Sequence, residues 1–101
     1  DNYLIQTQEM VELFPNFWAS HNMLGFYYWK HSEYEKAIKL LEKALELNYS
    51  PLHISTLGYL YAKNGDKKQA QEMLSKLVQL NKKISVASFN YFIIMSVFRA
   101  T

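Results

Sequence analysis

The chain has 101 residues and a mass of 11.9 kDa, which fits one domain and excludes a multi-domain enzyme. Hydrophobic residues make up 50% and charged residues 20%, so there are enough apolar side chains for a packed core. The chain has no Cys, which excludes disulfides, thiolate metal ligands and a Cys nucleophile. Its 3 Gly and 2 Pro are too few for the turns of an all-β sandwich, so we expect an all-α fold.

The net charge of +2 is divided unevenly, with −3 over residues 1–50 and +5 over residues 51–101. This balance is only mildly basic and falls short of the concentrated charge that binding to a phosphate backbone usually requires. The chain begins with Asp-Asn rather than Met, and no basic-then-apolar signal segment is present. We expect a fragment of a longer, cytoplasmic protein.

Hydrophobic periodicity and helix-ending residues predict about six helices, at residues 2–13, 17–31, 34–47, 51–64, 67–81 and 86–99. In the third of these, apolar residues recur at steps of three and four and charged residues occupy the opposite side, which is typical of an amphipathic helix. At the turn after the fourth helix, Gly65 is expected to end that helix and Asp66 to cap the next. We likewise expect Ser32 to cap the helix that follows it.

The last predicted helix, at residues 86–99, is apolar nearly all round. Its apolar run of about 13 residues is too short to span a bilayer, which needs roughly 20. Two explanations stay open: a missing partner helix once covered one face, or this face forms a homodimer.

An internal repeat relates the middle of the chain to its second half. Residues 24–28 read LGFYY and residues 57–61 read LGYLY, so Leu, Gly and Tyr each recur 33 positions later. Gly25 and Gly58 fall inside predicted helices, where Gly costs about 1 kcal/mol relative to Ala. We therefore expect two helix backbones to approach closely at each glycine. The expected core is Leu24, Gly25, Tyr28, Ala37, Leu41, Ala44, Leu57, Gly58, Tyr61, Ala70 and Leu74.

The repeated residues resemble the tetratricopeptide repeat (TPR), a family of antiparallel helix pairs that stack into a right-handed superhelical solenoid. The matching positions are Leu24, Gly25, Tyr28, Tyr34, Ala37, Leu41, Ala44 and Leu45, then Leu57, Gly58, Tyr61, Gly65, Ala70 and Leu74. The departures are Ser32 for the usual Gly, Lys67 for the turn Tyr, Leu77 for the second small residue, and Tyr49 and Lys82 for Pro.

The resemblance implies how the chain divides into repeat units. Residues 17–50 and 51–83 would be two full units, residues 1–16 the second helix of a preceding unit, and residues 84–101 the first helix of a further one. Such repeats bind partner proteins and are not catalytic.

The resemblance also implies that the first helix of each unit lines a concave groove that binds an extended peptide or a helix. Carried over position by position, the peptide-binding groove residues are Asn22, Phe26, Trp29, Lys30, Ser55, Tyr59, Lys63, Phe92, Ser96 and Arg99. These residues fall on three predicted helices. Those at 22–30 lie on one helical face, as do those at 55–63, and each of these two groups contains an aromatic residue and ends in Lys. Such a groove suits a peptide with acidic and bulky apolar groups. The alternative is that Trp29 and Tyr59 pack in the core.

Other functions have weaker support. Phe26 stands where members of the family that clamp a terminal carboxylate have Asn, so we do not expect that activity. The three His lack metal-ligand spacing and no Gly-rich phosphate loop is present, so no enzyme, metal or cofactor is expected. Two alternatives to peptide binding remain: a helical-repeat nucleic-acid-binding segment that uses the basic half, and an architectural spacer that self-associates.

Overall fold

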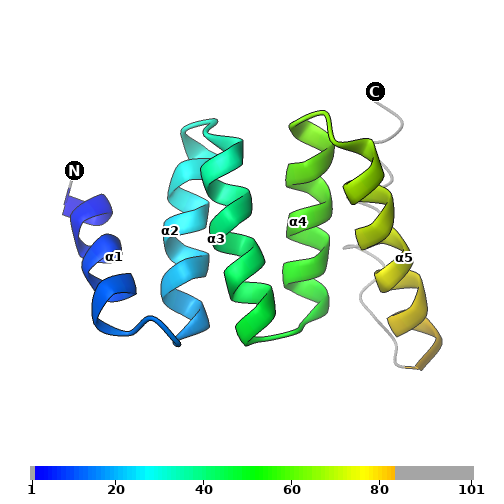
Figure 1. The fold of residues 1–101 in the computed structure, drawn as a ribbon, viewed down its shortest axis with the longest axis horizontal. Helices are drawn as coiled ribbons and strands as arrows, with labels where there is room; N and C mark the ends of the chain where they lie inside the picture. Colours follow the sequence, from blue (N-terminus) through cyan, green and yellow to red (C-terminus); the bar gives the residue numbers. More distant parts are fainter. Residues whose placement is uncertain (1, 84–101) are drawn as a thin grey trace. The chain divides into compact units, whose positions relative to one another are not determined.

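A computed structural model describes residues 2–83 of the chain, which divides into two compact units, residues 1–49 and 50–101. The first unit contains α1 (Asn2–Leu13), α2 (Trp18–Lys30) and α3 (Tyr34–Leu47), and the second contains α4 (Pro51–Lys63) and α5 (Lys67–Lys83) (Figure 1). These are five of the predicted helices, and their ends agree with the predicted ends within two residues. The expected helix at 86–99, with its dimer face, lies outside the described residues.

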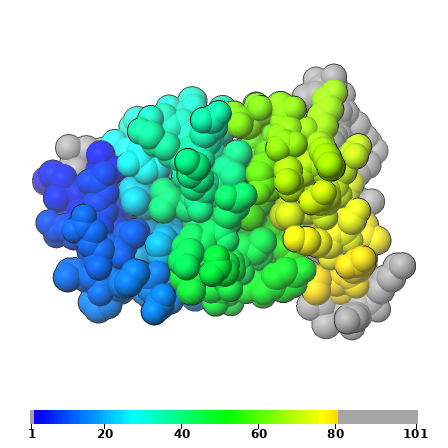
Figure 2. Space-filling model, viewed as in Figure 1, coloured from blue at the N-terminus to red at the C-terminus, as the bar shows by residue number. Residues whose placement is uncertain are grey.

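In the first unit, α2 packs against both α1 and α3, and in the second unit α4 packs against α5. The helices α2 and α3 run antiparallel (Figure 1), and in the space-filling view their atoms meet without a gap on the face shown (Figure 2). The centre of the predicted apolar stripe of α3 is buried, with Ala37, Leu41 and Ala44 each 0% exposed, while Leu40, Leu45 and Leu47 are half-buried. Burial of this stripe therefore holds the first helix pair together.

The expected core agrees closely with the observed burial. Its members are all buried except Tyr28 and Leu74, which are half-buried. In α5 the neighbouring positions Met73 and Leu77 are buried at 5% and 1% exposure. Leu77, a departure from the small residue usual in the repeat, thus serves as a core side chain.

Gly25 lies at the contact between α2 and α3. A Cβ atom built on Gly25 would overlap Leu41 Cδ2, and it would also lie 3.4 Å from Leu40 Cβ and 3.5 Å from the Ala37 carbonyl oxygen. Because α3 approaches the backbone of α2 this closely, only Gly fits here without a shift. The expected close approach is confirmed at this glycine.

The turns that end α2 and α4 share one hydrogen-bonding pattern. The Ser32 and Gly65 backbone N–H groups donate to the Trp29 and Ala62 carbonyls at 2.9 and 3.1 Å. The next residues, Glu33 and Asp66, each donate to a carbonyl five positions back, both at 2.8 Å. This is the Schellman pattern, which places its central residue in the left-handed backbone region.

That central residue differs between the two turns. Gly65 has φ +86° and Ser32 has φ +61°, so a serine occupies a conformation that favours glycine. The expected cap at Asp66 is confirmed, because its Oδ1 accepts from the Gln69 backbone N–H at 3.2 Å. The expected cap at Ser32 is wrong: the N-cap of α3 is Glu33, without a side-chain cap, because the chain needs Ser32 for the left-handed step.

Gly25→Ala tests the close contact. The extra methyl must displace the fully buried Leu41, and this overpacking lowers the free energy of unfolding by about 1–3 kcal/mol. The loss outweighs the gain of about 1 kcal/mol from the higher helix propensity of Ala. We expect a net loss of about 1 kcal/mol in urea unfolding. In a Leu41→Ala background, itself about 2–5 kcal/mol less stable, the overlap is gone and Gly25→Ala should stabilise. Stabilisation by Gly25→Ala in the native background would contradict the packing described.

Exchanging the two turn residues tests the backbone strain. Ser32→Gly should raise the free energy of unfolding by about 0.5–1 kcal/mol, because relief of the left-handed serine exceeds the entropy that glycine adds to the unfolded chain. Gly65→Ser should lower it by a similar amount. Ser32→Ala is the matched control and should give no gain, since its Cβ meets the same backbone. Equal stability of Ser32→Gly and Ser32→Ala would refute the strain.

Candidate functional site

The predicted groove residues of the first unit lie along α2. Asn22, Phe26 and Trp29 are half-buried and Lys30 is exposed. The Phe26 and Trp29 rings have centroids 5.5 Å apart, as expected for residues three positions apart on a helix. The structure therefore brings Phe26, Trp29 and Lys30 together at one end of α2, with the aromatic rings only partly covered.

In the second unit, the predicted residues lie along α4. Tyr59 is half-buried and Lys63 is exposed, with the Lys63 Nζ 6.0 Å from the centre of the Tyr59 ring. Ser55 differs from them, because it is 4% exposed and its hydroxyl donates to the Leu52 carbonyl at 2.9 Å. The remaining predicted residues, Phe92, Ser96 and Arg99, lie outside the described residues.

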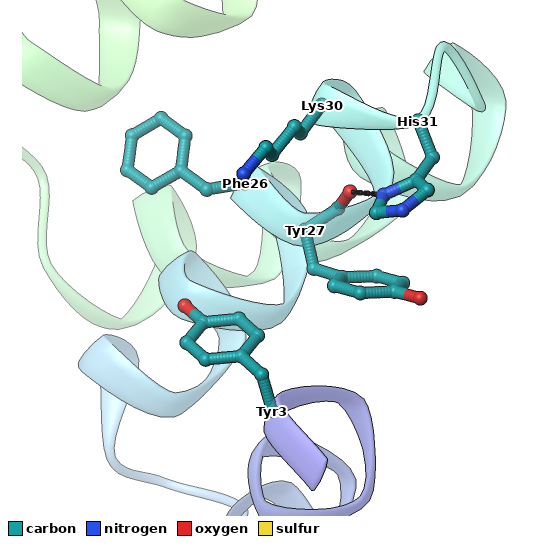
Figure 3. A pocket seen from close by; sticks show the side chains of 5 residues that line it. All are labelled: Tyr3, Phe26, Tyr27, Lys30 and His31. Carbon is teal, nitrogen blue, oxygen red and sulfur yellow. Dashed lines mark hydrogen bonds between the residues drawn. The ribbon is translucent and has the colours of Figure 1, made fainter. Parts of the chain in front are cut away.

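A pocket of about 470 Å³ opens between α1 and α2 (Figure 3). Tyr3 contributes one wall from the start of α1, and the other lining residues come from the end of α2: Phe26, Tyr27, Lys30 and His31. The two helices bring these ends together because the chain reverses direction between them (Figure 1). The pocket thus shares Phe26 and Lys30 with the predicted groove residues.

Tyr27 is the centre of a cluster of rings at this pocket. Its ring stacks on His31, with centroids 4.3 Å apart, and on Tyr3, with centroids 6.1 Å apart. Tyr27 and Tyr28 form a T-shaped pair with ring centroids 5.5 Å apart. His31 Nδ1 lies 2.8 Å from the Tyr27 carbonyl oxygen, which can only accept, so the His31 Nδ1–H donates and its Nε2 is the acceptor when the ring is neutral. The ring contacts and this hydrogen bond fix the orientation of the Tyr27 and His31 rings, which form one wall of the pocket.

The charge at the pocket is positive. Its five lining residues include Lys30 and no acid. Among the described residues, the ion pairs involve Lys36 and Lys43 rather than Lys30. Glu33, three positions beyond Lys30, is bound to Lys36 at 3.1 Å, and that hydrogen bond raises the pKa of the Lys36 ammonium. Lys30 therefore presents its charge to solvent beside four aromatic rings.

Tyr3, Tyr27 and His31 were not among the sequence-predicted site residues. Tyr3 comes from another helix, so only the folded structure shows its proximity to α2. For the other two a signal existed: at the repeat offset of 33, Tyr27 corresponds to Leu60 and His31 to Asn64. These aromatic rings depart from the internal repeat, whereas Phe26 and Lys30 correspond to Tyr59 and Lys63 and follow it.

Within the described part of the chain, no group of three or more His, Asp or Glu side chains is arranged to hold a metal ion. Among the helices from α1 to α5, none has the length and apolar character needed to cross a membrane.

Comparison with known proteins adds the family. Two family models match the chain, at residues 18–50 and 55–84, and each describes a tetratricopeptide repeat. Together the matched segments cover more than half of the chain. No curated protein matches the sequence.

Proposed function

Since the chain belongs to the tetratricopeptide repeat family, we propose that it is a non-catalytic module that binds an extended peptide or a helix of a partner protein. The fold is an all-α helical-repeat solenoid, and repeats of this family are generally protein–protein interaction modules. The site we assign is the partly exposed side of the first helix in each matched repeat. Its residues are Phe26, Trp29 and Lys30 on α2, and Tyr59 and Lys63 on α4.

The observation that carries the proposal is the recurrence of an aromatic ring with an exposed Lys four positions later. Phe26 and Lys30 in the first unit correspond to Tyr59 and Lys63 in the second at the repeat offset of 33. Half-buried aromatic side chains are common anchors of binding sites, and Lys favours negatively charged partners. The partner is therefore a peptide with acidic and bulky apolar side chains.

The further groove residues and the unit boundaries are part of the same proposal. Asn22 is assigned to the binding face of α2, and Phe92 and Arg99 to the helix expected at 86–99. Ser55 is only 4% exposed and its hydroxyl donates to the Leu52 carbonyl, so it is not expected to contact the peptide directly. The proposed units remain residues 17–50 and 51–83.

Selection of peptides from a random display library against the full chain tests the function. We expect the selected peptides to be enriched in Asp or Glu next to aromatic or large aliphatic residues. Lys30→Glu should weaken their binding by tenfold or more, about 1.4 kcal/mol, because attraction becomes repulsion. The control Lys39→Glu reverses an exposed charge on α3, outside the proposed site. Failure to select any peptide, or an equal effect of both charge reversals, would overturn the proposal.

Trp29→Ala distinguishes a binding residue from a core residue. If Trp29 belongs to the binding face, the variant should lose only about 1 kcal/mol of its free energy of unfolding, which is the size expected for the ring contact with Phe26. Its affinity for a selected peptide should fall about tenfold or more. A core Trp would instead lose about 3–5 kcal/mol of stability. Urea unfolding and calorimetric titration of the same variant measure both quantities, and a core-sized loss of stability would remove Trp29 from the site.

A further inference from the structure

We propose that the pocket between α1 and α2 binds one aromatic side chain of the partner, and that Lys30 binds an acidic residue adjacent to it in the partner's sequence. The proposal rests on the proposed peptide-binding function and adds a specific subsite to it. The juxtaposition that carries it is a ring-lined pocket with one Lys at its edge (Figure 3).

The lining of the pocket suits an aromatic side chain, and its volume of about 470 Å³ is large enough to admit one. Tyr3, Phe26 and Tyr27 bound it from different directions (Figure 3). A ring placed among them gains offset-stacked and edge contacts in addition to its buried area. An aliphatic side chain would gain the burial alone.

The wall formed by Tyr27 and His31 is held in place before any partner binds. Tyr27 is fixed between Tyr3 and His31, and His31 is fixed in turn by its hydrogen bond to the Tyr27 carbonyl oxygen. Few side chains therefore need to be ordered on binding, which lowers the entropic cost of association.

The positive charge of Lys30 favours an acidic residue next to the inserted aromatic side chain in the partner's sequence. The Lys30 side chain extends toward the Phe26 side of the pocket (Figure 3), and no acidic side chain lines the site. A carboxylate on the residue next to the inserted ring would therefore meet an uncompensated ammonium group. Because this position is exposed, the pair is expected to raise the affinity by no more than about fivefold.

Two of the rings that line the pocket are not repeated in the second unit. Leu60 and Asn64 stand in the second unit where Tyr27 and His31 stand in the first. The subsite therefore distinguishes the two units, although both carry the aromatic and Lys pair.

Titration of the isotope-labelled full chain with short blocked peptides, followed by NMR, tests the subsite. The probes are acetyl-Gly-Trp-Glu-Gly-amide and the same peptide with Gln in place of Glu or Leu in place of Trp. We expect the Trp-Glu peptide to bind two- to fivefold more tightly than the Trp-Gln peptide, and three- to tenfold more tightly than the Leu-Glu peptide. The largest amide shifts should occur at Tyr3, Phe26, Tyr27, Lys30 and His31.

Variants assign these preferences to residues. Lys30→Gln should abolish the preference for Glu over Gln, whereas the matched control Lys63→Gln, at the equivalent position of the second unit, should keep that preference. Tyr27→Leu, which introduces the residue found at that position in the second unit, should weaken every Trp peptide three- to tenfold, and Tyr27→Phe should not. Because Lys30 is exposed, its variant tests the proposal even if Tyr27→Leu unfolds.

The outcomes separate this subsite from the broader function. Shifts confined to Trp29 and Tyr59, or equal affinity for the Glu and Gln peptides, would overturn the subsite and leave peptide binding on α2 and α4 intact. Absence of shifts with every probe would also overturn it, and the display selection would then decide the function independently.

Discussion

The contact between α2 and α3 at Gly25 is the constraint on which the first unit depends. With no side chain at that position, Leu41 reaches the backbone of α2, and the fully buried Ala37, Leu41 and Ala44 of α3 close the helix pair. The same contact fixes the rotation of α2 about its axis. Once the Gly25 side of α2 faces α3, Phe26 and Trp29 are left only partly covered, and Tyr27 meets the ring of Tyr3 on α1. The packing of the core thereby determines which residues remain for binding.

Most of the fold followed from local signals in the sequence. Periodicity located α1 to α5 within two residues at each end, and the offset of 33 identified Gly25 as a position where two helix backbones approach closely. The error at Ser32 has a physical reason. Serine is a good helix cap in most contexts, but here hydrogen bonds around the turn place it in the left-handed region, at a position that glycine fills in the second unit.

The site was less predictable than the fold. The pair of Phe26 and Lys30 is visible in the sequence because it repeats as Tyr59 and Lys63. The pocket beside it is not, because Tyr3 belongs to a helix that precedes the repeat and lies near Tyr27 only after folding. The internal repeat identifies residues that the two units share, but the pocket depends on Tyr27 and His31, which Leu60 and Asn64 replace in the second unit.

The strained turn at Ser32 also affects how the binding end of α2 moves. The Ser32 and Glu33 amides are bonded to the carbonyls of Trp29 and Tyr28, so opening of this turn releases the last turn of the helix that carries Trp29, Lys30 and His31. Strain in a turn lowers the free energy of such local opening. A partner that requires the closed helix end must then slow hydrogen exchange at these two amides, and the corresponding turn at Gly65, which carries no such strain, provides the internal reference.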